Sequence, residues 1–380
     1  MDIWLFLLIL ISIFIGWVLG QWRPFKKNGA TGAAESYSES YAKGLNYLLS
    51  DDSENAIKVF SEIIEVNPNT IEIHLSLGNL FRSKGQVDRA IKVHQSLLAR
   101  PGLSRKQRNL AIEELANDYL KAGLLDRAEK LFKEMIQLKA DNIVAYQRLL
   151  DLYIAEKSWD EALGCAQALY DRKETDAATV LSQCLCELAA NAASKGNRKI
   201  AGDKLLQALQ VDESCVRAAL LLIQWHLDDA DTVAAKKVFQ RLVKRNPEYI
   251  ELYLEPAKQI YLRDKDSSGY QKFLQQQYNL KPSTRLAIAL LEYYTTNNKP
   301  EKARQLLYEV LENSPPFDFV LRFLRPDSLQ LPDTWEGLSS FLKSMQDNKL
   351  EFVCTNCGYQ SHAIQWNCPS CRHWSSMRPV

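Results

Sequence analysis

Four cysteines near the end of the chain form two CxxC pairs, Cys354 with Cys357 and Cys368 with Cys371. Two such pairs at this separation are typical of two knuckles that bind one tetrahedral metal ion through four thiolates. Gly358 directly follows the first pair and suits the positive φ that such a turn favours. We therefore predict a metal site whose ligands are these four cysteines.

The ligand set does not choose between zinc and iron, because four thiolates in a tetrahedron suit either ion. The sequences CGY and CPSC at the two pairs resemble rubredoxin, so iron stays a candidate beside zinc. Two disulfides would need an oxidising compartment, and a redox-active CxxC normally stands alone. Residues 350–380 are too few to bury a core unaided, so we expect one structural metal ion, with His362 and His373 on the surface.

An almost unbroken apolar run extends from Ile3 to Leu19. As a helix it would be about 26 Å long, just enough to cross a bilayer. A cleaved signal peptide would need a basic start, whereas this chain begins with Met1 and Asp2. We predict a transmembrane anchor at residues 1–22 and a juxtamembrane linker at 23–36. The positive-inside rule then places the rest in the cytoplasm, because basic residues follow the run: Arg23, Lys26 and Lys27.

The overall charge gives no sign of nucleic-acid binding. The chain has 47 basic and 46 acidic residues, a formal net charge of +1, and no long basic run outside the juxtamembrane segment. Four further cysteines fall within helical patterns without knuckle spacing, as reduced core cysteines do. These are Cys165, Cys184, Cys186 and Cys215.

A repeat with a period of 34 residues fills the middle of the chain. Small residues at Ala56 and Ala90 set its register, with aromatic residues and prolines at the positions typical of tetratricopeptide repeats. Insertions near 101–108 and 172–177 lengthen two of the later steps, and the match is weakest at 181–211. The register continues at Ala128, Ala162, Ala201, Ala235, Gly269 and Ala303.

These patterns predict an all-α fold dominated by a superhelical solenoid. Each unit is a helix pair that approaches closely at the small residues, and stacked pairs form a groove lined by the first helices. We place about eight repeats at 37–317, a capping helical segment at 318–349 and the rubredoxin-like metal module at 350–380. Polar residues on first helices are the candidates for binding a partner: Asn79, Arg82, Asn117, Gln147 and Arg148.

The sequence contains no convincing catalytic set. His74, His94 and His226 lie in separate repeats, and neither GxxxxGK[ST] nor GxGxxG occurs. Paired acids such as Glu113 and Glu114 are more simply explained as solvated helix surface. We therefore predict that the protein is not an enzyme.

The order of these parts resembles the lipopolysaccharide assembly protein B family of Gram-negative bacteria. The stretch HLSLGNLFRSKGQVDRAIKVH, from His74 to His94, is similar to the second repeat of that family. The segments CTNCGY, at 354–359, and WNCPSC, at 366–371, fit its metal module. Repeats alone would be a weak signal, but the resemblance covers nearly the whole chain.

This resemblance implies a single-pass inner-membrane protein that faces the cytoplasm and regulates lipopolysaccharide synthesis. Family members are thought to help a membrane-bound AAA metalloprotease degrade the deacetylase that commits the cell to lipid A, and to gather other synthesis enzymes. The four cysteines would be the metal ligands. Two other functions stay open: a membrane-tethered scaffold for another envelope pathway, and a rubredoxin-like electron carrier. A homo-oligomer is also compatible with the sequence.

Overall fold

The computed structural model describes residues 40–47, 52–66, 71–139, 142–312 and 351–379, besides Ser12, Phe14, Trp17 and Ser50. The chain divides into two compact units, Met1–Ala145 and Tyr146–Val380. Each unit is described by itself.

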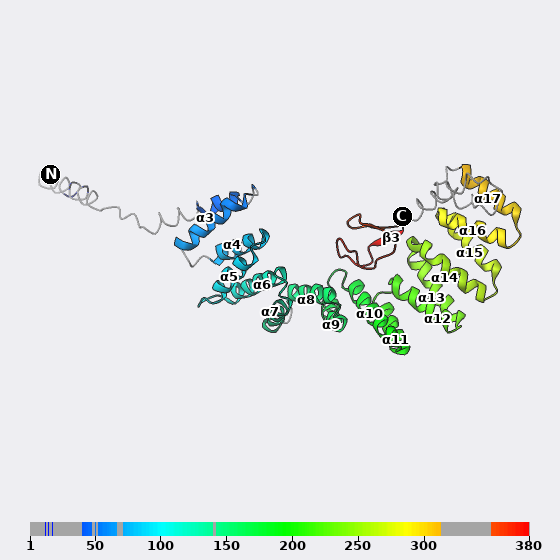
Figure 1. Ribbon diagram of the computed structural model, residues 1–380, viewed down its shortest axis with the longest axis horizontal. Coiled ribbons are helices and arrows are strands. Elements are labelled where there is room, and N and C mark those ends of the chain that lie inside the picture. The colour runs from blue at the N-terminus through cyan, green and yellow to red at the C-terminus, as the bar shows by residue number, and fades with distance from the viewer. Residues whose placement is uncertain are drawn as a thin grey trace, which may run out of the picture. The chain divides into compact units, whose positions relative to one another are not determined.

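The described part of the first unit is a series of antiparallel helix pairs (Figure 1). A helical stretch at 40–47 precedes the labelled helices. These are α3 (Ser53–Val66), α4 (Ile71–Ser83), α5 (Val87–Leu98), α6 (Arg105–Lys121) and α7 (Leu125–Leu138), and α8 (Ile143–Glu156) begins at the boundary with the second unit.

The second unit continues the same pattern of paired helices and ends in a small sheet (Figure 1). Its later helices are α9 (Trp159–Asp171), α10 (Ala177–Ser194), α11 (Arg198–Val211), α12 (Val216–Asp228), α13 (Thr232–Arg245), the 3-10 turn η1 (Pro247–Tyr249), α14 (Ile250–Arg263), α15 (Ser267–Leu280), α16 (Thr284–Thr296) and α17 (Pro300–Glu312). The helices confirm the predicted solenoid over the described part of 37–317.

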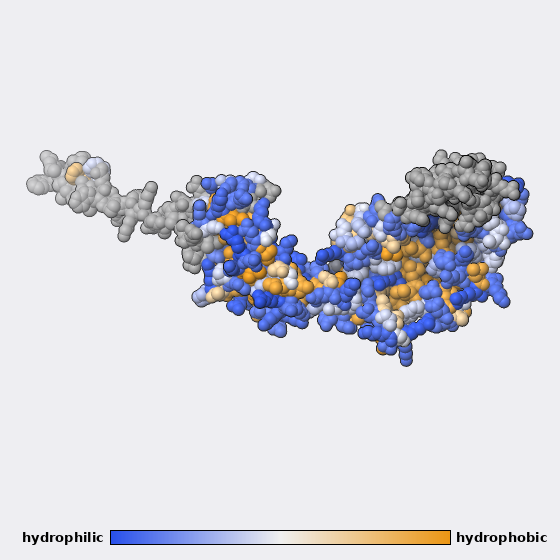
Figure 2. Space-filling view, viewed as in Figure 1, coloured by the Kyte–Doolittle hydropathy of each residue, from blue (hydrophilic) through white to orange (hydrophobic). Residues whose placement is uncertain are grey.

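Small residues lie at the helix crossings, as the sequence register predicted. Ala56, Ala90, Ala128, Ala162, Ala201 and Ala235 have no exposed surface at all. Aromatic side chains such as Phe60, Phe132 and Phe239 fill the seams between pairs, and each is at most 2% exposed. The helices approach closely because the Ala side chains occupy so little of the crossing. Figure 2 shows apolar side chains gathered over the region of α12 to α14, surrounded by a mostly polar surface.

Both predicted insertions fall between repeats. The chain from Ala99 to Ser104 joins α5 to α6, and the chain from Arg172 to Asp176 joins α9 to α10. The first connection ends earlier than predicted because Ser104 and Gln107 form a capping box that starts α6. The weakly matching stretch 181–211 nevertheless forms part of the pair α10 and α11.

The turns inside the pairs repeat one backbone geometry without repeating one residue. Gly85, Gly123 and Gly196 have positive φ, as the tetratricopeptide pattern suggests. The equivalent turns of other pairs place a different residue in the left-handed region: Lys157, Ala230, Lys265 and Asn298, with φ between 54° and 59°. Helix packing therefore imposes the turn even where its sequence mark is missing.

A buried polar network joins three helices of the first unit. His94 and Asp118 are both fully buried, and the imidazole Nδ1 lies 2.6 Å from a carboxylate oxygen of Asp118. Arg82 donates to Asp118 at 2.8 Å and forms an ion pair with Glu114 at 2.6 Å. The His94 ring stands where repeats usually carry a large apolar side chain, so α5 is fixed to α6 by polar contacts as well as by packing.

The metal module adds a three-stranded antiparallel sheet to the otherwise helical protein. Its strands are β1 (Phe352–Cys354), β2 (Gln360–Ser361) and β3 (Met377–Pro379), in the order β2-β1-β3. Phe352 pairs with both Ser361 and Pro379. The all-α prediction therefore holds for the described solenoid, and the strands belong to the rubredoxin-like module.

The predicted membrane anchor, linker and capping segment lie mostly outside the described residues. The predicted anchor at 1–22 is represented only by Ser12, Phe14 and Trp17, and the linker at 23–36 and the capping segment at 318–349 not at all. Within the residues that are described, no helix has the length and apolarity to span a bilayer.

The close packing of α4 against α5 should leave no room for a methyl group added at Gly78. A Cβ added at Gly78 would lie 2.3 Å from Nε2 of His94, whose ring is buried and held by Asp118. We predict that Gly78→Ala lowers the free energy of unfolding of the first unit by about 1–3 kcal/mol, measured by denaturant titration. The matched Gly164→Ala change meets no atom within 4 Å and should instead stabilise α9 by about 0.5–1 kcal/mol. Equal effects at both positions would contradict the assigned contact.

Candidate functional site

The four predicted cysteines come together at one point. All four sulfur atoms lie within 4.8 Å of one another. The separation is 3.7 Å from Cys354 to Cys371 and again 3.7 Å from Cys357 to Cys368. A tetrahedral ion with metal–sulfur bonds of about 2.3 Å requires sulfur atoms about 3.8 Å apart. The residues present therefore fit one tetrahedral metal ion, and no other group of three potential ligands appears in the described part of the chain.

Local hydrogen bonds prepare the sulfurs for a cation. The amide of Asn356 and the backbone N–H of His373 lower the pKa of the Cys371 thiol to about 5, which favours the thiolate form that a metal ion binds. Burial raises the pKa of Cys368 to about 11, so the metal must displace its proton. Gly358 has φ of 75°, which confirms the predicted knuckle turn.

The module lies against helices of the second unit that come first in their pairs, α10 and α16, and against the turn η1. Gln183 of α10 donates to the hydroxyl of Ser375 at 3.1 Å, and the hydroxyl of Tyr249 donates to the carbonyl oxygen of the same serine at 3.3 Å. The guanidinium of Arg378 lies 4.3 Å from the centre of the Tyr249 ring, and Arg285 of α16 pairs with Glu351 at 2.7 Å. These contacts tie the strand β3 and the start of β1 to the solenoid.

Apolar contacts reinforce this docking. Phe352, Cys354, Cys368 and Met377 form the small core of the module, and Leu252 of α14 packs against it from the solenoid. From the other direction, Ile364 and Trp366 of the module pack against the large apolar cluster of the second unit. The apolar core of the module and the apolar cluster of the solenoid are therefore in direct contact, which makes the module part of the second unit.

The structure places the five candidate partner-binding residues in two different settings. Asn79 and Arg82 belong to the inter-repeat network, since Arg82 donates to the amide oxygen of Asn79 at 2.8 Å and pairs with two carboxylates. Asn117 is half-buried on α6, whereas Gln147 and Arg148 are exposed on α8. Arg82 thus has a structural task, and Gln147 and Arg148 have the accessibility that contact with a partner needs.

Sequence reasoning missed the residues that dock the module. The hydrogen bond from Gln183 to Ser375 joins positions 192 apart, and that from Tyr249 to Ser375 joins positions 126 apart. No periodic signal connects such distant positions. The aromatic residues of the module, including Trp366, were the only available hint, because exposed aromatic groups on so small a fold require a surface to cover them.

Models of known families match both parts of the chain. The rubredoxin metal binding domain matches residues 352–379. Tetratricopeptide repeats match residues 40–70 and 73–106, and a PPR repeat, another helix-pair unit, matches residues 115–139.

Curated relatives match the chain over almost its full length. The lipopolysaccharide assembly protein B of Haemophilus influenzae is 32% identical, covering 99% of this chain and 98% of the relative. The protein of the same name from Escherichia coli K12 is 28% identical, covering 99% and 97%. Among solved structures, the C-terminal part of a TPR repeat-containing protein from Cytophaga hutchinsonii is 12% identical with a TM-score of 0.40, covering 70% of this chain and 99% of that one.

Loss of one ligand should release the metal. We predict that wild-type protein holds one ion per chain and that Cys371→Ser or Cys354→Ser lowers this severalfold, measured by elemental mass spectrometry of purified protein. The module should unfold in these variants while the helical circular dichroism of the solenoid persists. Cys184→Ser, which changes a buried cysteine of α10, is the control and should keep full metal content. Retention of the ion in Cys371→Ser would contradict the four-ligand site.

The docking contacts should be separable from metal binding. We predict that Arg378→Ala, which removes the contact with the Tyr249 ring and a 3.9 Å ion pair with Glu248, loosens the module without releasing the ion. Hydrogen–deuterium exchange at 247–253 and 373–379 should become about fivefold faster, corresponding to about 1 kcal/mol. Arg304→Ala, which breaks an exposed pair with Glu301, should leave exchange at these segments unchanged.

Proposed function

Because this chain belongs to the lipopolysaccharide assembly protein B family, we propose that it acts in lipopolysaccharide assembly as a regulatory adaptor. The observation that carries this proposal is the match over 99% of the chain to relatives of that name. Repeat solenoids with exposed first helices suit the binding of other proteins, and no catalytic constellation is needed for such a task.

The adaptor acts at the bacterial inner membrane. The apolar run from Ile3 to Leu19 anchors the chain, and the basic residues after it keep the solenoid on the cytoplasmic side. Anchoring raises the effective concentration of the solenoid near membrane proteins, so that a weak contact suffices for capture. The partners are a membrane-bound AAA metalloprotease and the deacetylase that commits the cell to lipid A, whose degradation the adaptor promotes, and other synthesis enzymes gather on it.

The residues of the metal site have a structural task in this function. A bound zinc or iron ion would cross-link the two knuckles and so hold β1 and β3 together. Ser375 and Arg378 follow the second knuckle and contact Gln183 of α10 and Tyr249 of η1. The fold of the module therefore determines the shape of the surface that it forms together with α10 and η1, which we call the recognition surface. A tetratricopeptide scaffold for another envelope pathway would use the same surface with different partners.

The half-life of the lipid A deacetylase in living cells tests the adaptor function. We predict that depletion of this protein lengthens that half-life severalfold and raises the steady-state level, because the protease loses its access to the enzyme. A pulse–chase measurement with immunodetection of the deacetylase provides the readout.

Two complementation controls sharpen this experiment. The full chain should restore rapid turnover, and a chain lacking residues 1–22, expressed to the same abundance, should not, because it loses the local concentration supplied by the anchor. An unchanged half-life after depletion would reject the protease adaptor and favour the general scaffold. Full restoration by the anchorless chain would reject the role of the membrane.

A further inference from the structure

Two buried cysteines of the second unit lie in contact outside the metal site. Cys186 of α10 has no exposed surface, and Cys215, the residue that precedes α12, is 2% exposed. Their sulfur atoms lie 3.9 Å apart, although the two positions are 29 residues apart in the chain. Both thiols are free, and the adaptor function proposed above uses neither of them.

The two thiols differ in how readily they ionise. Cys215 stands at the N-terminal end of α12, where the helix dipole favours a negative charge. The hydrogen bond from Cys186 lowers the pKa of Cys215, although burial opposes this shift. The same hydrogen bond, together with burial, raises the pKa of Cys186, which therefore keeps its proton. Cys215 is thus the sulfur that reacts first, and Cys186 is the thiol held against it.

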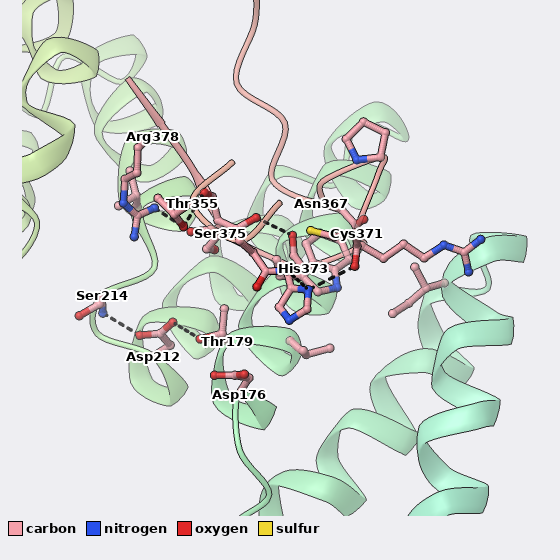
Figure 3. A pocket seen from close by; sticks show the side chains of 18 of the residues that line it. Asp176, Thr179, Asp212, Ser214, Thr355, Asn367, Cys371, His373, Ser375 and Arg378 are labelled. Atoms are coloured by element: carbon pink, nitrogen blue, oxygen red, sulfur yellow. Dashed lines mark hydrogen bonds between the residues drawn. The ribbon is translucent and has the colours of Figure 1, made fainter. Parts of the chain in front are cut away.

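The neighbours of Cys215 line a cavity of about 1020 Å³, which lies between the metal module and the helices α8 and α10. Ser214 and Val216 belong to its solenoid wall; in Figure 3, this wall carries Asp212 and Ser214, and the facing wall carries His373 of the module. Cys215 itself does not line the cavity, so an oxidant reaches its sulfur when the short connection between α11 and α12 opens locally. A small opening admits hydrogen peroxide, whereas glutathione disulfide needs a large one.

We propose that Cys186 and Cys215 form a reversible disulfide when a hydroperoxide reacts with Cys215, and that this disulfide loosens the metal module on the solenoid. This redox step does not depend on the proposed adaptor function. It suits a protein on the cytoplasmic side of a membrane, because disulfides there are usually transient and sense the redox state.

The oxidation takes two steps. In the first, the sulfur of Cys215 attacks one oxygen of hydrogen peroxide: an S–O bond forms, the O–O bond breaks, and the leaving hydroxide takes the proton that Cys215 has released and becomes water. In the second, the sulfur of Cys186 attacks the resulting sulfenic sulfur: the S–S bond forms, the S–O bond breaks, and the leaving hydroxide takes the thiol proton of Cys186. Two thiols thus lose two electrons and two protons, and one hydrogen peroxide becomes two water molecules.

Gln183 of α10 connects this pair to the metal module. Its amide donates to the sulfur of Cys215 at 3.6 Å and to the hydroxyl of Ser375 at 3.1 Å. A disulfide requires the sulfurs to approach to about 2.05 Å, and Cys215 can move because it lies just outside α12. Its sulfur then retreats from Gln183 and becomes a poorer acceptor, so the amide is held less firmly against Ser375.

Peptide mapping of the full-length, metal-loaded protein after treatment with hydrogen peroxide tests the disulfide. Remaining thiols are alkylated in denaturant, and the protein is digested with trypsin. Cleavage after lysine and arginine places Cys215 in the peptide 205–217 and Cys186 in the peptide 174–195, which also contains Cys184. We expect these two peptides to be joined in most of the oxidised protein and to separate after dithiothreitol.

Matched variants identify the sulfurs. Cys184→Ser should keep the link, because burial raises the pKa of Cys184 to about 12 and Cys186 is still present. Cys186→Ala and Cys215→Ser should each abolish it. Glutathione disulfide at the same concentration should form the link about tenfold more slowly, because it needs the larger opening. Metal content and circular dichroism are measured for every variant, so that an unfolded protein is not scored as an unreactive one.

Hydrogen–deuterium exchange tests the coupling to the module. Exchange at residues 373–379 should become about threefold faster in the oxidised wild type, because the contact between Gln183 and Ser375 weakens, and should recover after dithiothreitol. Cys186→Ala protein treated with peroxide should exchange at these residues like its own untreated sample.

Several results would overturn the inference. Absence of the link while the metal stays bound would do so, as would a link that persists in Cys186→Ala. A disulfide that leaves exchange at 373–379 unchanged would reject the coupling to the module. Release of the metal before the link forms would assign the reaction to the metal-site cysteines instead. None of these outcomes bears on the deacetylase half-life in depleted cells, so the redox step and the protease adaptor fail separately.

Discussion

The position of the metal module on the helices of the second unit depends on four sulfur atoms gathered within 4.8 Å. A chain of some thirty residues with only four buried residues in its apolar cluster cannot fold without a cross-link, and a tetrahedral ion supplies one. Once β1 and β3 are paired, Ser375 and Arg378 reach the solenoid and the cavity acquires its second wall. Metal binding therefore allows the module to fold, the folded module docks on the solenoid, and this docking sets the shape of the recognition surface.

The solenoid depends on a different constraint, which is the close approach of the two helices in each pair. Alanines with no exposed surface set the spacing, and aromatic rings fill the seams that this spacing creates. His94 departs from that rule by placing an imidazole in a seam, and the cost of burying it is offset by Asp118 and Arg82. A solenoid built this way is rigid locally, which suits a surface that must hold a docked module and a partner segment in register.

Local signals in the sequence were sufficient for the helical repeats and the metal ligands. The spacing of Cys354, Cys357, Cys368 and Cys371 encodes a site within a few turns of chain, and the alanine register encodes each helix pair. The turns at Lys157 and Ala230 adopt the positive φ usual for glycine because the packing of the adjoining helices imposes it. The residue types at these two positions therefore gave no signal of the turn. The docking of Ser375 onto Gln183 was beyond sequence reasoning, since it joins segments 192 positions apart through contacts with no repeat. Arg82, which the sequence suggested as a partner-binding residue, forms ion pairs with Glu114 and Asp118, because an arginine on a first helix also faces the next repeat.

The central claim is that the metal ion holds the module in one position against the solenoid. Its most direct test is the distance distribution between two spin labels on non-canonical residues at Gln365 of the module and Gln240 of α13, measured by pulsed electron resonance on the full chain. Both positions are exposed and lie in the second unit. The account predicts one narrow distribution in the metal-loaded protein and a broad one after removal of the ion by a chelator. A distribution that stays narrow without the ion, or is broad with it, would contradict the account.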